Sequence, residues 1–263
     1  MNRLRWALAD GATLTRRDLD HWARQPAQVV IGLLFPVMIL VMFGYLLGGG
    51  MTVAGGGEYR EFLVPGTLAL TMVFGLEGTF QAIKSDVARG VTDRFRSMPM
   101  APSAVVVGRS AADLLNAVVS LAALVLCGLA IGWRWHSGLA AALAAFGLLL
   151  LLRLAMLWVG IYLGLVVRGE GALVAVQILV WPLGFLSNTF ASPSSMPGWL
   201  GAIAEWNPLS STVGAARELF GNPGWGGSSW VAEHAILMAV VWPALLIAIF
   251  FPLSVHRYRT LDR

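Results

Sequence analysis

The sequence predicts an all-α integral membrane protein with six transmembrane helices, an N-terminal amphipathic helix and short re-entrant helices between the fifth and sixth spans. Hydrophobic residues make up 57% of the 263 residues and charged residues only 12%, whereas a soluble domain carries about 25% charged residues. The mean hydropathy of +0.73 agrees with this balance. Because so few charges cannot cover a surface that faces water, the composition excludes a soluble enzyme and a disordered chain.

Six apolar blocks of the chain are candidates for transmembrane helices. A helix needs about 20 mostly apolar residues to cross about 30 Å of hydrocarbon. The third and fourth blocks are longer than this, which predicts that they tilt or project into water. The fifth is short and contains Pro182, so re-entrant structure is expected after it. The blocks comprise residues 29–47, 62–83, 104–131, 139–167, 173–186 and 235–255.

The positions of the basic residues predict the orientation, because Lys and Arg favour the cytoplasmic side. If the N-terminus is cytoplasmic, fourteen of the 18 basic residues fall in cytoplasmic segments. Three fall outside (Arg60, Arg134 and Arg217), and Arg153 lies within the membrane. Both termini are therefore predicted to be cytoplasmic. The basic balance is a signal of membrane topology, so no nucleic-acid partner is expected.

Three segments outside the spans complete this single transmembrane domain. Residues 1–28 place charged and apolar side chains on opposite helical faces, which predicts an amphipathic helix in the inner interface; an ordinary solvated leader is the alternative. Residues 84–103 form a cytoplasmic loop of mixed charge. Residues 187–233 are rich in tryptophan and poor in charge, which predicts short re-entrant helices at the outer interface.

No pattern for catalysis, cofactor binding or metal binding is found in the sequence. There is no G-x-x-x-x-G-K-[ST] phosphate loop, and Lys84, the single lysine, has no glycine cradle beside it. The four histidines lie too far apart for metal-ligand spacing. Cys127 is alone and is expected to be a small buried apolar residue.

Charged residues within the apolar blocks are the strongest candidates for a functional role. Glu77, Asp113 and Arg153 each fall inside a predicted span, with Gln81 and Asn116 one turn away on two of them. An isolated charge at the bilayer centre costs roughly 2.5–3.5 kcal/mol on insertion scales, so such groups pair or face a wet cavity. Two interpretations stay open: an ion pair that locks helices together, or a polar lining of a substrate path.

Small residues at G-x-x-x-G spacing predict close contacts between helices. For each pair we expect packing within one subunit rather than a dimer seam. The pairs are Gly44/Gly48, Gly128/Gly132 and Gly160/Gly164.

A family resemblance is carried by three stretches: T-R-R-D-L and R-Q-P within residues 15–26; D-V-A-R-G-V-T-D-R-F-R-S-M-P and V-G-R within 86–109; and M-P-G-W-L, E-W-N-P-L and A-R-E-L-F-G within 196–221. In this order they resemble the connecting helix, the coupling segment and the outer re-entrant region of type-2 ABC exporter permeases. The daunorubicin/doxorubicin-resistance permease group is the most similar, over nearly the whole chain. Many related permeases have a glutamate-rich start to the coupling segment, whereas here Asp86 stands nearly alone.

The resemblance implies the permease subunit of an ATP-driven exporter in the bacterial cytoplasmic membrane, which is not an enzyme by itself. ATP and Mg are then bound by a separate ATPase subunit, present in two copies. A second permease copy, identical or a sister protein, is needed to enclose a path. The implied cargo is a hydrophobic or amphipathic small molecule, such as an antibiotic or a lipid-like compound, so the implied outcome is drug efflux and antibiotic resistance.

The resemblance also implies roles for particular residues. In segment 84–103, mixed charge suits docking to the ATPase, Phe95 and Met98 are apolar anchors, and Pro99 ends the helix; a solvated charged loop is the alternative. The implied coupling residues are Asp86, Arg89, Gly90, Asp93, Arg94, Phe95, Met98 and Pro99. The implied re-entrant residues are Pro197, Trp199, Trp206, Asn207, Pro208, Arg217 and Glu218.

Two other functions stay open from the residues alone. One is a proton-coupled secondary transporter, in which Glu77 or Asp113 relays the proton. The other is a membrane scaffold that recruits an enzyme and transports nothing.

Overall fold

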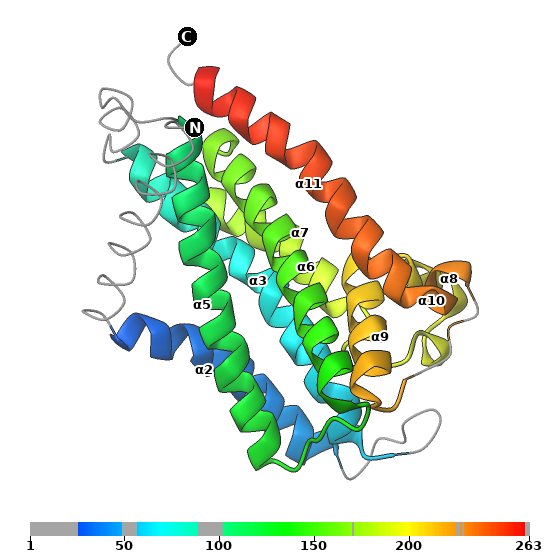
Figure 1. Ribbon diagram of the computed structural model, residues 1–263. Coiled ribbons are helices and arrows are strands. Elements are labelled where there is room, and N and C mark those ends of the chain that lie inside the picture. Colours follow the sequence, from blue (N-terminus) through cyan, green and yellow to red (C-terminus); the bar gives the residue numbers. More distant parts are fainter. Residues whose placement is uncertain are drawn as a thin grey trace.

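The computed structural model describes residues 26–48, 57–88, 102–169, 171–224, 227 and 229–260, and within these ranges the regular structure is entirely helical (Figure 1). Long helices lie side by side, and short helices gather at one end of the bundle. The elements are α2 (Pro26–Met42), η1 (Phe43–Leu47), α3 (Tyr59–Ala88), α5 (Pro102–Ala130), α6 (Gly138–Val166), α7 (Ala172–Phe185), η2 (Pro193–Ser195), α8 (Gly198–Glu205), α9 (Pro208–Phe220), α10 (Trp230–Glu233) and α11 (Ala235–Thr260).

Among the described residues, four helices are long and apolar enough to cross a membrane: Tyr59–Ala88, Ser110–Ala130, Gly138–Val166 and Ala235–Tyr258. Two shorter apolar helices, Gly32–Leu46 and Ala172–Phe185, correspond to the first and fifth predicted blocks. The prediction of an all-helical membrane protein is confirmed. The predicted amphipathic helix lies almost wholly outside the described residues, which begin at Pro26.

Helix α3 is the centre of the bundle. It contacts α2, α5, α6, α7 and α9, and most of its length is buried, whereas α11 is largely exposed. Its fully buried side chains include Leu63, Leu68, Val73 and Phe80. A helix surrounded by other helices holds its neighbours in register, so α3 positions the polar side chains described below.

Glycines allow α6 to approach α3 closely. A Cβ atom at Gly160 would lie 2.9 Å from the carbonyl oxygen of Leu76, and one at Gly164 would lie 2.8 Å from Cβ of Ile83. The predicted Gly160/Gly164 pair therefore packs within the subunit, as expected of small residues at helix contacts. Gly128 has a similar role on α5, where a Cβ would lie 3.1 Å from Cγ1 of Val64.

The two ends of the bundle differ in construction. At the "α9 end", α3 and α6 begin, α5 and α7 end, and helices α8, α9 and α10 cover the bundle (Figure 1). At the opposite "Lys84 end", Lys84 Nζ donates a hydrogen bond of 2.8 Å to the carbonyl of Gly169. The distribution of arginines predicts that the α9 end faces outward and the Lys84 end faces the cytoplasm.

Replacing Gly160 by valine should destabilise the α3/α6 contact, because the new side chain would meet backbone. We expect Gly160→Val to lower the free energy of unfolding by about 1–3 kcal/mol, which is typical of overpacking. Thermal unfolding in detergent micelles measures this. The control is Gly147→Val on the same helix, where a Cβ has no neighbour within 4 Å. Equal losses in both variants would contradict the close α3/α6 contact.

Candidate functional site

A buried ion pair joins three helices of the bundle. Arg153 on α6 pairs through Nη2 with Oδ1 of Asp113 on α5. The same Nη2 donates a hydrogen bond of 2.8 Å to Oγ1 of Thr79 on α3, which lies 3.1 Å from Asp113 Oδ1. Arg153 is only 4% exposed. These contacts agree with the first of the two interpretations left open by the sequence, a pair that locks helices together, and the polar lining of a path stays a prediction.

The guanidinium of Arg153 needs a glycine opposite it. A Cβ at Gly75 would lie 2.5 Å from Nη1 and 2.6 Å from Cζ of Arg153, so the group lies directly against the backbone of α3. Gly75 and Thr79, one turn apart on α3, were missed by sequence reasoning. Within the described part of the chain, Arg153 Nη1 and Asp113 Oδ2 are buried without a hydrogen-bond partner.

Glu77 does not join this ion pair. It accepts hydrogen bonds from two side chains of α7: Gln177 Nε2 to Oε2 at 3.1 Å and Trp181 Nε1 to Oε1 at 2.9 Å. Glu77 is half-buried, and Gln81, one turn further along α3, is exposed. Asn116 lies near Asp113 on α5 and is also half-buried. The predicted set of intramembrane polar residues therefore divides into a buried pair and a carboxylate at an accessible side of the bundle.

Aromatic rings surround Trp181, the indole that donates to Glu77. The ring of Trp181 lies 6.1 Å from Phe35 on α2, 6.0 Å from Phe74 on α3 and 6.1 Å from Phe185 on α7, measured between centroids. Trp181 itself is 41% exposed. Glu77 contacts the N–H edge of the Trp181 indole, so a carboxylate lies next to a cluster of aromatic rings. Gln177 and Trp181 were not singled out from the sequence, although a glutamine inside an apolar run is a detectable signal.

The predicted re-entrant segment forms a compact cap at the α9 end. Asn207 is the N-cap of α9: its Oδ1 accepts from the backbone N–H of Leu209 at 2.9 Å, and Pro208 takes the first helical position. Asn207 Nδ2 donates to the carbonyls of Leu183 and Leu186 at 2.7 and 2.9 Å. One side chain thus satisfies groups at the start of α9 and at the end of α7.

Arg217 fastens α9 to the start of α3. Its Nε donates to the carbonyl of Phe62 at 2.9 Å, and its Nη2 donates to the carbonyls of Asn188 and Thr189 at 3.0 and 3.2 Å. Its Cζ lies 3.4 Å from the centroid of the Phe62 ring. Burial lowers the pKa of the Arg217 guanidinium to about 9, so the group still carries its charge at neutral pH.

The other predicted re-entrant residues are less enclosed. Trp199 and Trp206 are 69% and 59% exposed, and Glu218 is exposed. Pro197 precedes α8 as its N-cap. Exposed tryptophans at the end of a membrane bundle are typical of the lipid interface.

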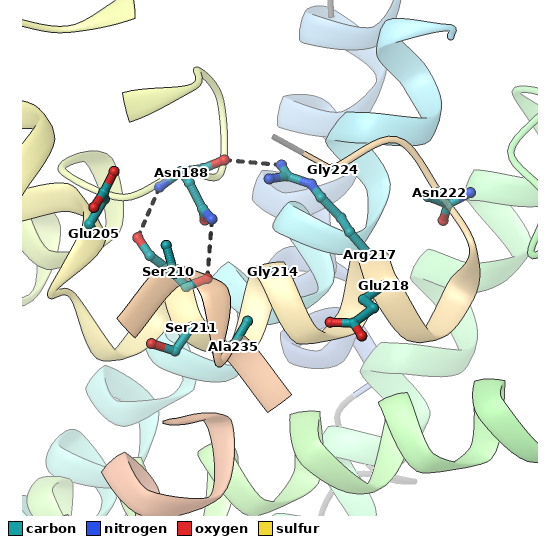
Figure 2. Close-up of a pocket in the computed structure, with 11 residues that line it drawn as sticks. Asn188, Glu205, Ser210, Ser211, Gly214, Arg217, Glu218, Asn222, Gly224 and Ala235 are labelled. Carbon is teal, nitrogen blue, oxygen red and sulfur yellow. Dashed lines mark hydrogen bonds between the residues drawn. The ribbon is translucent and has the colours of Figure 1, made fainter. Parts of the chain in front are cut away.

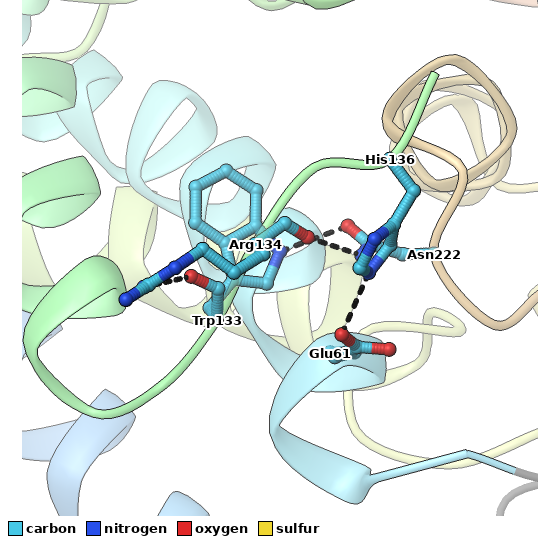
Figure 3. Close-up of polar contacts among 5 residues, drawn as sticks. All are labelled: Glu61, Trp133, Arg134, His136 and Asn222. Atoms are coloured by element: carbon cyan, nitrogen blue, oxygen red, sulfur yellow. Dashed lines mark hydrogen bonds and ion pairs between the residues drawn. The ribbon is translucent and has the colours of Figure 1, made fainter. Parts of the chain in front are cut away.

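A second polar cluster closes the α9 end (Figure 3). Trp133 Nε1 donates to Asn222 Oδ1 at 2.8 Å, and Asn222 Nδ2 donates to the carbonyl of Arg134 at 2.8 Å. His136 Nε2 lies 2.8 Å from Glu61 Oε1. These contacts hold the α5–α6 connection against α3 and against the chain that follows α9. In the described ranges, no group of three His, Cys, Asp or Glu side chains is arranged to hold a metal ion.

The predicted coupling residues fall mainly outside the described part of the chain. Asp86 lies in the last turn of α3 and has an interaction partner. The others lie outside the described residues, so their role stays a prediction; they are Arg89, Gly90, Asp93, Arg94, Phe95, Met98 and Pro99.

Comparisons with known proteins give one consistent result. The family model of the ABC-2 type transporters matches residues 11–220. The daunorubicin resistance ABC transporter permease protein DrrB1 of Streptomyces coeruleorubidus is 33% identical over 96% of this chain and 88% of its own length. The putative transport permease ycf38 of Cyanophora paradoxa is 26% identical over 91% and 84%. The probable doxorubicin resistance ABC transporter permease protein DrrC of Mycobacterium tuberculosis is 24% identical over 82% and 78%.

The Arg153–Asp113 pair can be tested by a double-mutant cycle. Arg153→Met and Asp113→Asn should each destabilise the protein by about 3–5 kcal/mol, because each leaves an unpaired polar group buried. The double variant should lose less than the sum, because neither charge remains. Thermal unfolding in detergent micelles measures all three. Additive losses would show that the two side chains do not interact.

Proposed function

Since this chain belongs to the ABC-2 type transporter family, we propose that it is the six-span permease of a bacterial exporter for amphipathic small molecules. As a permease, it is the membrane component of an ATP-driven transporter. We propose that two copies of a separate ATPase subunit bind ATP and Mg, and that a second permease copy completes the path. Family membership favours this function over a proton-coupled transporter and over a scaffold.

Two hydrogen bonds at opposite ends of α3 support a fifth span that includes the short helix α7. Lys84 bonds to the carbonyl of Gly169 at the Lys84 end, and Tyr59 Oη donates to the carbonyl of Phe190 at 3.1 Å at the α9 end. At 1.5 Å per residue, Tyr59 and Lys84 lie about 38 Å apart along α3. This distance exceeds the hydrocarbon thickness of about 30 Å. Residues 169–190 therefore extend far enough to cross, although α7 alone has 14 residues.

The first span is supported by the continuity of α2 and η1. The two helices follow each other directly and contain 17 and 5 residues. At the α-helical rise they extend about 33 Å together, which matches the hydrocarbon thickness. With the four long helices and the segment that includes α7, this makes six crossings and leaves both termini on one side.

The observation that carries the proposed substrate path is the Glu77 carboxylate beside Trp181. A carboxylate inside a span is costly, and such residues mark substrate or ion pathways in membrane proteins. Here Gln177 and Trp181 orient the carboxylate on a half-exposed side of α3. Asp113 is also half-buried, but its charge is paired with that of the buried Arg153. We therefore assign the path to the Glu77 side and a structural role to the pair.

The class of cargo is inferred from this site and from the names of two relatives. One relative is named as a daunorubicin resistance permease and another as a probable doxorubicin resistance permease. The aromatic rings and the carboxylate of Glu77 suit a molecule with an apolar body and a cationic group. We propose an amphipathic drug-like cation as the cargo.

A second permease copy is supported by the exposed apolar side chains of α2 and α7, the two helices that pack against the Glu77 region of α3. Leu34 and Met38 of α2 are exposed, as are Ile178 and Leu179 of α7. A single chain leaves the Glu77 side open, whereas a second copy facing it would enclose a path between the two. The second copy is either identical or a sister permease.

Helix α3 offers a mechanical connection between the ATPase and the path. Its last turn contains Asp86, at the start of the coupling segment 84–103, its middle carries Glu77, and its start is held by Arg217 through Phe62. We propose that closure of the ATPase dimer pushes the coupling segment and tilts α3 as a rigid body. The bundle then alternates between inward-open and outward-open arrangements.

Docking of the ATPase can be tested at the two predicted apolar anchors. Phe95→Asp and Met98→Asp should each weaken co-purification with the ATPase encoded beside this gene, because each places a carboxylate in an apolar contact. We expect a loss of about tenfold in affinity, which corresponds to about 1.4 kcal/mol. The control is Trp199→Asp at the α9 end, which should leave assembly unchanged. Unchanged co-purification of both anchor variants would remove the coupling role.

The role of Glu77 can be tested by transport. Glu77→Gln should lower ATP-dependent transport of a cationic amphipathic dye about tenfold, and should leave a neutral dye of similar size unaffected. Glu58→Gln changes an exposed carboxylate just before α3 and is the matched control. Transport in vesicles loaded with ATP is the measurement. Transport that persists without ATP and stops with an uncoupler would instead favour a proton-coupled mechanism.

A further inference from the structure

The three arginines predicted to lie outside the membrane differ in what they can still bind. Arg217 lines a pocket of 320 Å³ between the segment after α7, α9 and the start of α11 (Figure 2). Its guanidinium is fully buried and donates to three carbonyls. Arg60 is half-buried and Arg134 is exposed. Of the three, Arg60 and Arg134 can therefore reach a partner outside the protein.

Arg60 and Arg134 both cover carbonyl groups at the end of α5. Arg60, on α3, donates from Nη1 to the carbonyl of Ile131 at 3.1 Å. Arg134, in the α5–α6 connection, donates from Nη1 to the carbonyls of Leu129 and Trp133 at 2.8 and 2.7 Å. Cations are favourable here, because the last carbonyls of a helix carry partial negative charge. Since the three carbonyls belong to residues close together in the chain, the two guanidiniums occupy the same end of α5.

These contacts leave most donors of both guanidiniums unused. A guanidinium has five N–H donors, and in the described part of the chain both arginines donate hydrogen bonds through Nη1 alone. No nitrogen of Arg60 is buried without a partner among the described residues, in contrast to Nη1 of Arg217. The remaining N–H groups are therefore open to a partner that approaches from outside the bundle.

The depth of Arg60 corresponds to a layer of lipid headgroups. Arg60 and Lys84 both lie on α3, and the helical rise places them about 36 Å apart, or about 34 Å along the bilayer normal for an average tilt of about 20°. The hydrocarbon core is about 30 Å thick, and the bilayer is about 40–45 Å thick with its polar layers. When α3 crosses the bilayer, it therefore places one of these basic residues in each polar layer. Arg134 lies at the same level as Arg60, because both hold the end of α5.

Apolar side chains beside Arg60 face away from the bundle core. Tyr45 and Leu46 of η1 are exposed, as are Val41 and Met42 one turn before them. Cζ of Arg60 lies 4.8 Å from the centroid of the Tyr45 ring, a distance at which a cation and a ring attract each other. The positive charge therefore lies at the end of an exposed apolar face. A phospholipid has the same arrangement, with a charged headgroup at the end of apolar chains.

The acidic side chains nearby do not neutralise the outer side of this pair. Glu61 is paired with His136 at 2.8 Å, and the guanidinium of Arg134 points away from both of them (Figure 3). Glu58 is exposed and precedes Arg60 by two residues, which is about 200° around a helix, so it lies on another side. Two positive charges therefore face the surroundings, which favours an anion.

We propose that Arg60 and Arg134 bind the phosphate group of an anionic phospholipid, whose acyl chains lie along the exposed face of η1. Planar guanidiniums suit phosphate, because each can present two parallel N–H groups to its oxygens. Two guanidiniums favour a headgroup with a net negative charge, because they would repel the cation of a zwitterionic one. The bound lipid would connect η1, α3 and the end of α5. Its binding does not depend on the proposed transport function.

Native mass spectrometry of the purified, delipidated full chain can count the lipids that remain bound. We expect the unmodified chain to bind one phosphatidylglycerol about tenfold more tightly than phosphatidylcholine. Arg60→Gln and Arg134→Gln should each lower the affinity for phosphatidylglycerol about tenfold. The matched control is Arg168→Gln, which removes the same charge from an exposed arginine at the Lys84 end and should retain the lipid. Leu46→Asn should weaken binding several-fold by removing an acyl-chain contact.

Thermal unfolding in detergent micelles is the second measurement. Phosphatidylglycerol should raise the melting temperature of the unmodified chain and of Arg168→Gln, but not that of Arg60→Gln or Arg134→Gln. Loss of a carbonyl contact can lower the melting temperature of these two variants by itself. The shift on adding lipid is therefore compared within each variant.

Four results would overturn the proposal. Equal retention of both lipids by every variant would indicate an apolar surface without headgroup recognition. Displacement of the lipid by millimolar inorganic phosphate would indicate a site for free anions. An equal loss in Arg168→Gln would indicate unspecific attraction between charges. A dimer that dissociates in Arg60→Gln, with no lipid lost, would indicate that a second copy covers this face. None of these results affects the test of ATPase docking.

Discussion

Burying a cation in an apolar bundle costs several kcal/mol unless other groups neutralise it and accept its hydrogen bonds. Arg153 and Arg217 are the two arginines found buried among the described side chains, and both donate hydrogen bonds to groups of α3, while Nη1 of each has no partner there. Arg153 has the carboxylate of Asp113 and the hydroxyl of Thr79. Arg217 has the carbonyl of Phe62, two further carbonyls and the Phe62 ring. Arg153 therefore determines which helices lie beside the middle of α3, and Arg217 determines which lie beside its start.

Helix α3 brings these contacts together along its length. Arg217 holds its start, Arg153 holds its middle from the α6 side, and Glu77 faces α7 on another side of the same turn. Glu77 and Thr79 are two residues apart, which is about 200° around a helix, so one turn of α3 serves both a locked side and an accessible side. A movement of α3 at the Lys84 end would therefore change the surroundings of Glu77. The Arg153–Asp113 pair, which is bonded to Thr79 of α3, would move together with the helix.

Much of this arrangement could be predicted from the sequence, because the bilayer fixes the length of a spanning helix and makes charges within it costly. Apolar block length placed the helices, and charges inside apolar blocks identified Glu77, Asp113 and Arg153. The sequence could not decide which acid Arg153 reaches, because that depends on the rotation and crossing of three helices. The same limit applies to Thr79 and Trp181, whose roles depend on a charged side chain of a neighbouring helix, whereas Gln177 could have been noticed as a glutamine inside an apolar run.

The cap at the α9 end was predicted less completely, for a different reason. The topology assigned Arg217 to an external segment, as one of the three basic residues predicted outside the membrane, and a surface position is the usual consequence. Arg217 is completely buried because α9 folds back onto the start of α3. There its guanidinium meets the carbonyl of Phe62 and, in the segment after α7, the carbonyl of Asn188.

The hydrogen-bonding capacity of Arg217 is only partly used. Its Nε and Nη2 donate to three carbonyls, whereas its Nη1 has no hydrogen-bond partner among the described residues. Carbonyl dipoles stabilise a guanidinium without neutralising its charge, whereas an ion pair would do both. Glu205 and Glu218 line the pocket beside Arg217, so this end of the bundle also carries negative charge. A polar pocket beside Arg217 is therefore a consequence of using a cation, rather than an apolar side chain, to hold the cap onto α3.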